Sequence, residues 1–347
     1  MVVAAEQLRT LGKPFLSATV VRVQGSGYRR PGARMLASDE RWFAGSISGG
    51  CLERDVLTRG MWRTREQPAV LVRYSENEEA LDERSGSGCQ GVIDVLIQRH
   101  EPARDDVFAL MQRCLREERR AAHATVVVSE DPRLPVAARA VCGAGESAGD
   151  FELPALEELL ARGGPARLAA LGGSELLLEV LEPPPHLFVF GSGHDAGPLI
   201  GLAQQLGWSS SVWDALPRIS TRERLREAER YLTGSLASAV SALDACVRPV
   251  AVIMGHHLDQ DRRALEALIG SRALYIGVLG PRRRSEQMLA DAGLKPDARV
   301  YAPVGLQLGA ETPAEIALAI AAEIQATLTR SDAGALRLDP GAIHRVP

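Results

Sequence analysis

The stretch Phe188-Val189-Phe190-Gly191-Ser192-Gly193-His194-Asp195-Ala196-Gly197 lies between a predicted strand and a predicted helix. It satisfies the pattern G-x-G-x-x-A, and Asp214 ends the next predicted strand. In a dinucleotide site Gly191 would make the turn, Gly193 would let the backbone approach a diphosphate, and Asp214 would accept hydrogen bonds from a ribose. This setting predicts a Rossmann-like fold more strongly than it predicts NAD(P), because a fold does not fix its ligand.

Strands and helices alternate along the chain from this stretch onward. Such alternation predicts a doubly wound parallel sheet in an α/β domain. The predicted strands are 186–190, 209–213, 250–254, 273–279 and 299–301, with a short one near Tyr231; the predicted helices are 195–206, 261–269, 283–291 and 313–328. Pro183-Pro184-Pro185 favours a stiff, extended linker. We therefore expect an N-terminal domain over 1–182, a linker over 183–185, a Rossmann-like domain over 186–330 and a flexible tail over 331–347.

The N-terminal part has a different pattern, with short strands, hairpins and few helices. It predicts a mixed α+β domain with strands at 15–23, 34–37, 41–44, 69–74, 92–97, 124–129, 139–142 and 175–181. Helices are predicted through Glu6-Gln7-Leu8 and at 51–65 and 153–161. Between Val107 and Leu115, apolar residues recur at helical spacing and include Cys114. Cys114 is therefore predicted to be a core residue.

The most unusual stretch of this part is Gly45-Ser46-Ile47-Ser48-Gly49-Gly50-Cys51-Leu52-Glu53-Arg54-Asp55. A glycine-rich run can turn its N–H groups toward one point, and a helix that begins near Cys51 adds unpaired N–H groups and a positive dipole end. Such a combination binds anions and lowers the pKa of a thiol. The alternative is a tight turn with a small buried cysteine. Gly45, Ser46, Ser48, Gly49, Gly50 and Cys51 are the candidate ligand-binding residues.

Further candidate residues follow other predicted strands. Cys89 is a second glycine-flanked cysteine, in Gly86-Ser87-Gly88-Cys89-Gln90-Gly91. In the Rossmann-like part, His256 follows one strand, and Arg282 and Arg283 follow another. Because the carboxyl ends of parallel strands line the ligand crevice, these residues are candidates for an anionic ligand, with His256 as an acid or base. A satisfied structural histidine and a solvated helix start are the alternatives.

Composition excludes several classes of protein. The 347 residues carry a formal net charge of −4, so no bulk attraction to nucleic acid or membrane is expected. No apolar run approaches the length of a membrane span, and the N-terminus lacks the basic region of a signal peptide. Five cysteines without a CxxC pair fit a reducing compartment. We therefore expect a cytoplasmic protein. The zinc-site pattern HExxH is absent from the sequence.

Several stretches stand out along both parts of the chain. They are ATVVRV, RRPGARML, GSISGGCLE and GCQG, and then VFGSGHDAGPL, VIMGHH, YIGVLGPRRR and APVGLQLGAETPAEIA. Taken together, these stretches resemble the XdhC/CoxI family of accessory proteins for xanthine dehydrogenase and related molybdenum hydroxylases. Departures from the family pattern are Tyr28, Gln90, Gly255, Pro281 and Gln307.

The resemblance implies a maturation chaperone rather than a turnover enzyme. Such a chaperone binds the molybdenum cofactor (molybdopterin), protects it during sulfuration by a sulfurtransferase, and inserts it into an apo molybdenum hydroxylase. Homodimerisation would suit this chemistry. A backbone nest, arginines and a soft thiolate would suit a ligand that carries a phosphate and a dithiolene-bound metal. We therefore hypothesise that Cys51 contacts the molybdenum or its sulfur, with Cys89 as a second candidate.

Two other functions account for part of the sequence. An NAD(P)-dependent oxidoreductase would use Gly191, Gly193 and Asp214, with His256 as acid or base, but would leave the stretch from Gly45 to Cys51 without a role. A nucleotide-binding scaffold without catalysis would require neither cofactor chemistry nor Cys51.

Overall fold

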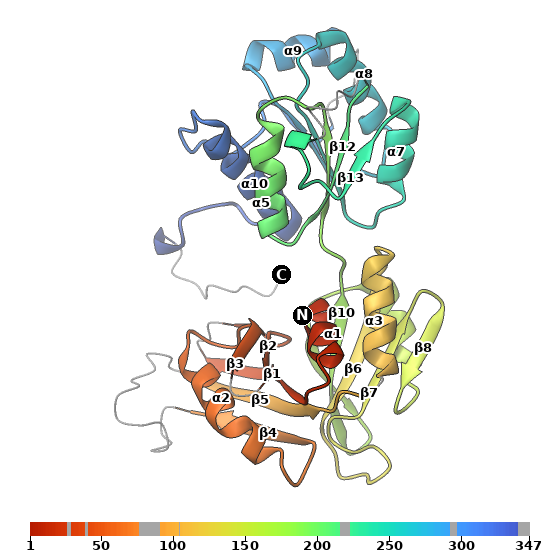
Figure 1. Ribbon diagram of the computed structural model, residues 1–347, viewed down its shortest axis with the longest axis vertical. Coiled ribbons are helices and arrows are strands. Elements are labelled where there is room, and N and C mark those ends of the chain that lie inside the picture. The colour runs from red at the N-terminus through yellow and green to blue at the C-terminus, as the bar shows by residue number, and fades with distance from the viewer. Residues whose placement is uncertain are drawn as a thin grey trace. The chain divides into compact units, whose positions relative to one another are not determined.

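The computed structural model describes residues 1–25, 29–38, 41–75, 91–103, 105–215, 223–291 and 297–338. The chain divides into two compact units, Met1–Glu182 and Pro183–Leu338, here called unit 1 and unit 2. Figure 1 shows unit 1 in red to yellow-green and unit 2 in green to blue. None of the helices within the described ranges is long and apolar enough to cross a membrane.

The first half of unit 1 forms an antiparallel sheet with one helix on its face. Five of the described strands pair in the order β3-β2-β1-β5-β4. The elements are α1 (Val2–Thr10), β1 (Phe15–Gly25), β2 (Arg34–Ser38), β3 (Arg41–Gly45), α2 (Cys51–Arg63), β4 (Ala69–Tyr74) and β5 (Gly91–His100). Leu16, Ala18 and Val20 alternate along β1 and pack with Leu52 and Val56 of α2. Period-two alternation in the strand thus meets the apolar stripe of the helix.

The second half of unit 1 forms another antiparallel sheet, with the order β8-β7-β6-β10-β9 among the described strands. Its elements are α3 (Asp106–Arg116), β6 (Ala121–Val128), β7 (Arg139–Gly143), β8 (Glu146–Gly149), α4 (Ala155–Arg162), β9 (Arg167–Leu171) and β10 (Ser174–Leu181). Leu156 and Leu159 of α4 cover the face formed by Ala124, Val126 and Leu176. Cys114 is fully buried on the apolar face of α3, as the helical spacing predicted.

The two sheets of unit 1 pack against each other through apolar and charged side chains. Val21 and Leu96 of the first sheet pack with Val127 and Leu177 of the second. Arg22 of β1 bonds Asp94 on the neighbouring strand at 2.9 Å and also Glu175 of β10 at 2.6 Å. The layer between the sheets is therefore partly polar, and its charges are paired, as burial requires.

Unit 2 is a doubly wound sheet. Six described strands, all parallel, lie in the order β13-β12-β11-β14-β15-β16. Numbered within the unit this is 3-2-1-4-5-6, the order of dinucleotide-binding sheets. Its elements are β11 (His186–Phe190), α5 (Ala196–Gln205), β12 (Ser209–Trp213), β13 (Arg230–Leu232), α7 (Leu236–Asp244), β14 (Pro249–Ile253), α8 (Leu258–Ile269), β15 (Tyr275–Val278), α9 (Arg282–Asp291), β16 (Val300–Tyr301), α10 (Pro313–Thr329) and a 3₁₀ helix (Leu336–Leu338). The predicted fold is confirmed for this part of the chain.

Helices cover both faces of this sheet. Leu187 and Val189 of β11 pack with α5 and α10, whereas Phe188 and Phe190 pack with α7 and α8. Both faces of β11 are therefore apolar, as expected for a parallel strand buried on two sides.

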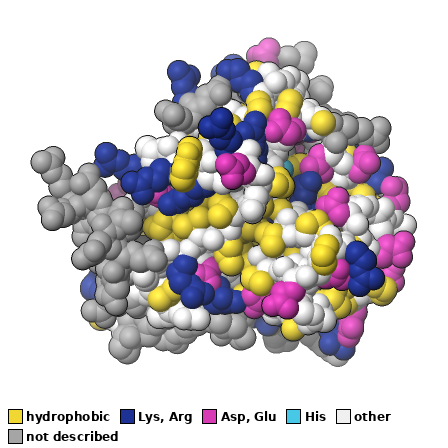
Figure 2. Space-filling model, turned by 90° about the horizontal axis from the view of Figure 1, so that it is seen from below, with side chains coloured by type: hydrophobic (Ala, Val, Ile, Leu, Met, Phe, Trp, Pro, Cys, Tyr) yellow, Lys and Arg dark blue, Asp and Glu magenta, His cyan; other side chains and the backbone are white. Residues whose placement is uncertain are grey.

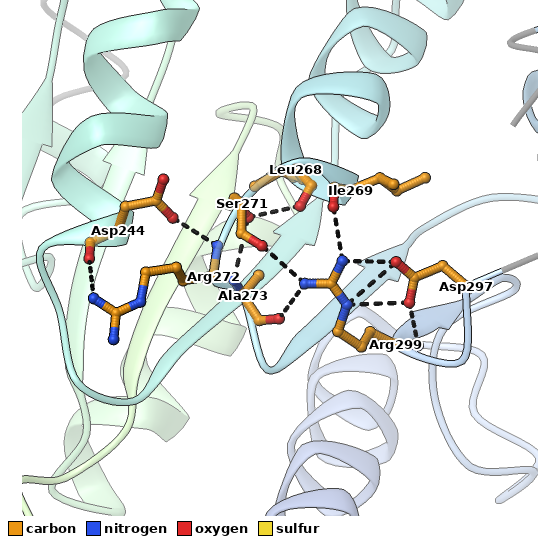
Figure 3. A network of polar contacts seen from close by, with 8 residues as sticks. All are labelled: Asp244, Leu268, Ile269, Ser271, Arg272, Ala273, Asp297 and Arg299. Atoms are coloured by element: carbon orange, nitrogen blue, oxygen red, sulfur yellow. Dashed lines mark hydrogen bonds and ion pairs between the residues drawn. The ribbon is translucent and has the colours of Figure 1, made fainter. Parts of the chain in front are cut away.

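Arg299 closes one edge of unit 2. Its guanidinium donates to the carbonyl oxygens of Ile269 (2.7 Å), Ser271 (2.9 Å) and Ala273 (2.9 Å), and it pairs with Asp297 at 2.7 Å (Figure 3). Ile269 is the last residue of α8, so the guanidinium satisfies carbonyl groups that the helix end leaves free. One side chain thus joins the end of α8 to the start of β16.

Four of the described elements were not predicted: β8, β9, α7 and the 3₁₀ helix, which lies in the stretch predicted as a tail. β8 and β9 are short outer strands with several exposed residues, so they lack the apolar alternation that marks a strand. Helix α7 was missed because it is rich in Ala and Ser. The residue before it, Ser235, is nevertheless a typical N-cap residue. The Ser235 hydroxyl accepts from the Ser238 N–H at 3.2 Å.

Candidate functional site

The loop after β3 begins at a position that requires glycine. Gly45 has φ +74°, and a Cβ there would lie 2.1 Å from the Arg34 carbonyl oxygen and 2.8 Å from Met1 Sδ. Both the backbone conformation and the close neighbours exclude a side chain. Gly45 therefore turns the chain from β3 into the loop before α2.

This loop gathers its N–H groups around an internal anion, the Glu53 carboxylate. Oε1 accepts from the N–H groups of Ile47 (2.9 Å) and Ser48 (2.7 Å), and Oε2 accepts from that of Gly50 (3.0 Å). Ser46 Oγ lies 2.8 Å from Oε1, and the Ser48 hydroxyl also donates to the carboxylate. The sequence predicted such a nest but assigned it to a ligand; within the structure its anion belongs to the first turn of α2.

The electrostatics of Glu53 follow from these contacts. Burial opposes ionisation, but hydrogen bonds from Ser48, Ser46 and the backbone outweigh it and lower the pKa of Glu53 from 4.5 to about 2. Ser48 completes the arrangement, because its Oγ accepts from the N–H groups of Gly50 (3.1 Å) and Leu52 (3.2 Å). The predicted ligand residues Ser46 and Ser48 are thus committed to the start of α2.

Cys51 and the two glycines before it form the rim of this nest. Cys51 is the first residue of α2 and is partly exposed, whereas Cys114, Cys142 and Cys246 are buried. Gly49 and Gly50 are exposed. The N–H groups of Gly49 and Cys51 have no hydrogen-bond acceptor among the described residues, so they remain orphan donors of a helix start. The Cys51 thiol packs partly against the core of the first sheet, with its Sγ 4.0 Å from Ser48 Oγ, and lies at the same helix start as these two amide donors.

An exposed indole borders the rim. Trp42 is 63% exposed, and its Nε1 donates to the Gly45 carbonyl at 2.7 Å. Trp62 on α2 is 73% exposed. Figure 2 shows a face on which hydrophobic side chains lie among Lys and Arg side chains. Exposed apolar groups rimmed by charge are typical of surfaces that bind another molecule. Cys89, the second candidate thiol, lies outside the described residues.

A second group of predicted residues meets in unit 2, where β11 and β14 end side by side. This is the point at which the strand order reverses, the usual place for a ligand in such sheets. Gly191 has φ +118°, and a Cβ there would lie 2.8 Å from the Gly255 nitrogen. A Cβ on Gly193 would lie 2.7 Å from His256 Nε2. The structure thus brings Gly191, Gly193 and His256 together, as the sequence predicted.

Asp214 joins this group through the glycine-rich loop. Ser192 Oγ donates to the Asp214 carboxylate, and the Tyr231 hydroxyl lies 3.4 Å from the same oxygen. Arg224 lies over the loop as well. Its guanidinium donates to the Ser192 carbonyl at 2.5 Å and lies 2.8 Å from His194 Nδ1. Arg224 was not predicted, because it lies within a polar run that has no recognisable phosphate pattern.

The loop that carries His256 is held by a buried ion pair. Asp261 of α8 is 4% exposed and pairs with Arg284 of α9 at 2.5 Å, and Arg284 also donates to the Gly255 carbonyl at 3.3 Å. Burial raises the pKa of Asp261 above its usual value, although the Arg284 charge opposes the shift. A Cβ on Gly255 would lie 1.9 Å from Asp261 Oδ1, which explains why this chain has glycine there.

Arg282 and Arg283, predicted to bind phosphate, are the exposed first residues of α9. The third arginine of the run, Arg284, reaches the site instead. The sequence alone does not distinguish Arg284 from its neighbours, because its position depends on Asp261, which lies on another helix. The candidate residues therefore form two groups, one at the start of α2 in unit 1 and one at the ends of β11 and β14 in unit 2.

Comparisons with known proteins identify the relatives of both units. The model of the XdhC and CoxI family matches residues 8–75, and the model of the XdhC Rossmann domain matches residues 187–324. A protein of Bacillus subtilis (strain 168) described as a probable xanthine dehydrogenase component is 29% identical over 294 residues, which cover 84% of this chain and 86% of that protein.

Two further relatives match along most of their length. The molybdenum cofactor insertion chaperone PaoD of Escherichia coli (strain K12) is 23% identical over 305 residues, covering 85% of this chain and 77% of that protein. The crystal structure of a xanthine dehydrogenase from Bacillus halodurans superposes with a TM-score of 0.79 at 26% identity, covering 96% of this chain and 97% of that one. With two family models matching in order and one structure matching from end to end, the chain belongs to the XdhC and CoxI family.

Proposed function

We propose that this protein binds the molybdenum cofactor and delivers it to a xanthine dehydrogenase-type molybdenum enzyme. The observation that carries the proposal is the partly exposed Cys51 thiol at the start of α2, beside the N–H groups of Gly49 and Cys51, which have no acceptor in the described part of the chain. Membership of the XdhC and CoxI family supports it, as does the similarity to a molybdenum cofactor insertion chaperone.

The chemistry of the rim fits a soft metal centre better than a phosphate. Thiolates are preferred ligands of soft transition-metal centres. The N–H groups of Ile47, Ser48 and Gly50, which could have surrounded a phosphate, already bond Glu53, so only those of Gly49 and Cys51 are left for the ligand. A Cβ on Gly50 would have no atom within 4 Å, so a ligand can approach this backbone closely. We infer that Cys51 binds the molybdenum or its sulfur, and that Gly49 and Gly50 admit it.

The same proposal covers how the bound molybdenum cofactor receives its sulfur and is released. Cys51 would hold the cofactor while a sulfurtransferase installs its sulfur, and would release it to the apo-enzyme. A homodimer would place two such sites on one carrier. The chain's own contribution is to orient the cargo on α2 and to keep the thiol accessible; the cofactor itself supplies the redox chemistry of the client enzyme.

Replacing the thiol tests the proposal. Protein purified from a molybdopterin-producing host is oxidised, and the bound pterin is measured as its fluorescent product. Cys51→Ser exchanges a soft ligand for a hard one, so bound pterin should fall about tenfold, equivalent to about 1.4 kcal/mol of binding.

Cys246→Ser is the matched control. This buried cysteine lies 3.5 Å from the Ala242 carbonyl and 3.6 Å from His186 Nδ1, so a serine hydroxyl can be satisfied there. Its pterin content should equal that of the unmodified protein. Normal pterin content and normal transfer to apo-enzyme in Cys51→Ser would refute the role of Cys51.

As a second candidate function, we propose that unit 2 binds a nucleotide, with NAD(P) as the candidate cofactor. The strand order and the meeting of Gly191, Gly193 and Asp214 favour this candidate. Calorimetric titration with NAD⁺ and NADP⁺ tests it, and dissociation constants above the millimolar range for both would exclude it.

A further inference from the structure

The second glycine of the fingerprint normally leaves room for a ligand, and in this structure a side chain of the protein lies in that room. In dinucleotide sites this glycine lets the backbone approach the diphosphate. Here the position of the missing Gly193 Cβ is 2.7 Å from His256 Nε2 and 3.5 Å from its Cε1. The imidazole therefore lies against Gly193 on the side where a diphosphate would make its closest contact.

The backbone that carries His256 is fixed. The Arg284 guanidinium bonds both the Gly255 carbonyl and the Asp261 carboxylate, and Asp261 packs directly on the Cα of Gly255. Met254, which precedes this loop, is 2% exposed and donates its N–H to the Phe190 carbonyl at 2.8 Å. The loop is thus tied to β11, α8 and α9. Rotation of the His256 side chain can open Gly193 and leave all of these contacts in place.

The side chain itself is far less constrained. His256 is exposed, and no hydrogen bond joins its ring to another of the described residues. Rotating an exposed, unbonded side chain about its staggered torsions breaks no hydrogen bond. The ring therefore has both the position to block the loop and the freedom to leave it.

We propose that His256 controls the access of a nucleotide diphosphate to the Gly191–Gly193 loop. The ring covers Gly193 in the ligand-free protein, and a diphosphate binds only after the ring rotates away. Apparent affinity is then reduced by the fraction of molecules in which the ring is open. This inference rests on the proposed nucleotide site of unit 2 and is independent of the cofactor proposal for unit 1.

Calorimetric titration of three proteins with ADP and with adenosine tests the inference. His256→Ala removes the ring, so its affinity for ADP should rise about tenfold, the factor expected when the open form is about one molecule in ten. Adenosine has no phosphate to place against Gly193, so its affinity should not change. His257→Ala is the matched control, since it removes the neighbouring exposed histidine, and it should bind ADP as the unmodified protein does.

Four results would overturn the inference. Weaker ADP binding by His256→Ala would show that the ring is a ligand contact rather than an obstacle. Equal ADP binding by all three proteins would show that the ring does not obstruct ADP, and an equal gain for adenosine would show that its effect is not specific to the diphosphate. Failure of all three to bind would show that His256 is not what excludes the nucleotide. Since the pterin assay of Cys51→Ser is separate, none of these results affects the cofactor proposal.

Discussion

At the scale of single residues, each glycine-rich stretch is occupied by a side chain of the protein itself. Glu53 lies in the nest before α2, and His256 lies against Gly193. The reason for glycine differs between the two places: a Cβ on Gly45 would meet the Arg34 carbonyl oxygen, whereas a Cβ on Gly193 would meet the His256 ring. The Glu53 carboxylate is held by hydrogen bonds, and the His256 ring is exposed and has no hydrogen bond to another of the described residues.

Glu53→Gln tests the structural role of the nest. A neutral amide cannot satisfy three N–H groups and two hydroxyls as the carboxylate does. We expect the free energy of unfolding to fall by about 1–2 kcal/mol at pH 7, a value reduced for the partial exposure of the group. Because the folded-state pKa is lowered from 4.5 to about 2, this stabilisation is present above pH 4.5 and is lost as the pH falls toward 2.

Urea denaturation at a series of pH values measures both quantities. Glu66→Gln, an exposed position just beyond α2, is the control and should leave the unfolding free energy within about 0.5 kcal/mol. A Glu53→Gln protein as stable as the parent at pH 7 would contradict the assignment of the nest to Glu53.

At the scale of elements, helix ends and strand ends decide where the candidate residues lie. α2 places Cys51 at its first position, and β11 and β14 end side by side at the reversal of strand order. Arg299 likewise holds the C-terminal end of α8, where its guanidinium bonds three carbonyl groups and the Asp297 carboxylate. The planar guanidinium provides this set of directed donors, and an ammonium group does not.

Arg299→Lys should therefore destabilise unit 2 even though the charge is kept. We expect a loss of about 1–3 kcal/mol in the free energy of unfolding, since several carbonyl groups lose their donors. Denaturation measures the loss, and faster amide hydrogen exchange in β15 and β16 would locate it. Arg272→Lys is the matched control, because this exposed side chain makes one contact of 3.3 Å with the Asp244 carbonyl (Figure 3). Equal losses for the two variants would contradict the role given to Arg299.

At the scale of the whole molecule, both units bury titratable side chains. Asp261 is buried in unit 2, and His100 and His123 are buried in unit 1. His100 bonds Ser17 at 2.8 Å and stacks on Phe15. Its pKa is lowered from 6.5 to about 3, by burial first and then by the Arg139 charge. Burial also lowers the pKa of His123.

Unit 1 should therefore lose stability in mild acid. Below pH 6.5 the unfolded chain takes up a proton at His100 that the folded protein does not, so stability falls until the pH reaches about 3. The slope is about 1.4 kcal/mol per pH unit for one such histidine. Denaturation of His100→Gln should show a shallower slope between pH 6 and 4, whereas His257→Gln, at an exposed position, should retain the parent slope. An unchanged slope in His100→Gln would contradict the neutral, buried state of His100.

Local sequence determined much of this protein. Period-two alternation and helical spacing gave most elements of both units, and the glycines, the Pro183–Pro185 run and the strand–turn–helix motif gave the Rossmann-like fold. The family followed from phrases in both units. These features could be predicted because they depend on residues close together in the chain, where backbone geometry and side-chain size act directly.

Only the tertiary structure decided what the glycine-rich stretches contain. The sequence shows that N–H groups converge near Gly50 and that room exists at Gly193, but it does not show which group fills each space. Glu53 reaches the nest because the loop folds back on the first turn of α2. His256 reaches Gly193 because β11 and β14, more than fifty residues apart in sequence, are adjacent in the sheet. The physical reason is that the acceptor of a hydrogen bond, or the side chain that fills an open space, is whichever group the folded chain places there. That group depends on the fold of the whole chain and not on the local sequence.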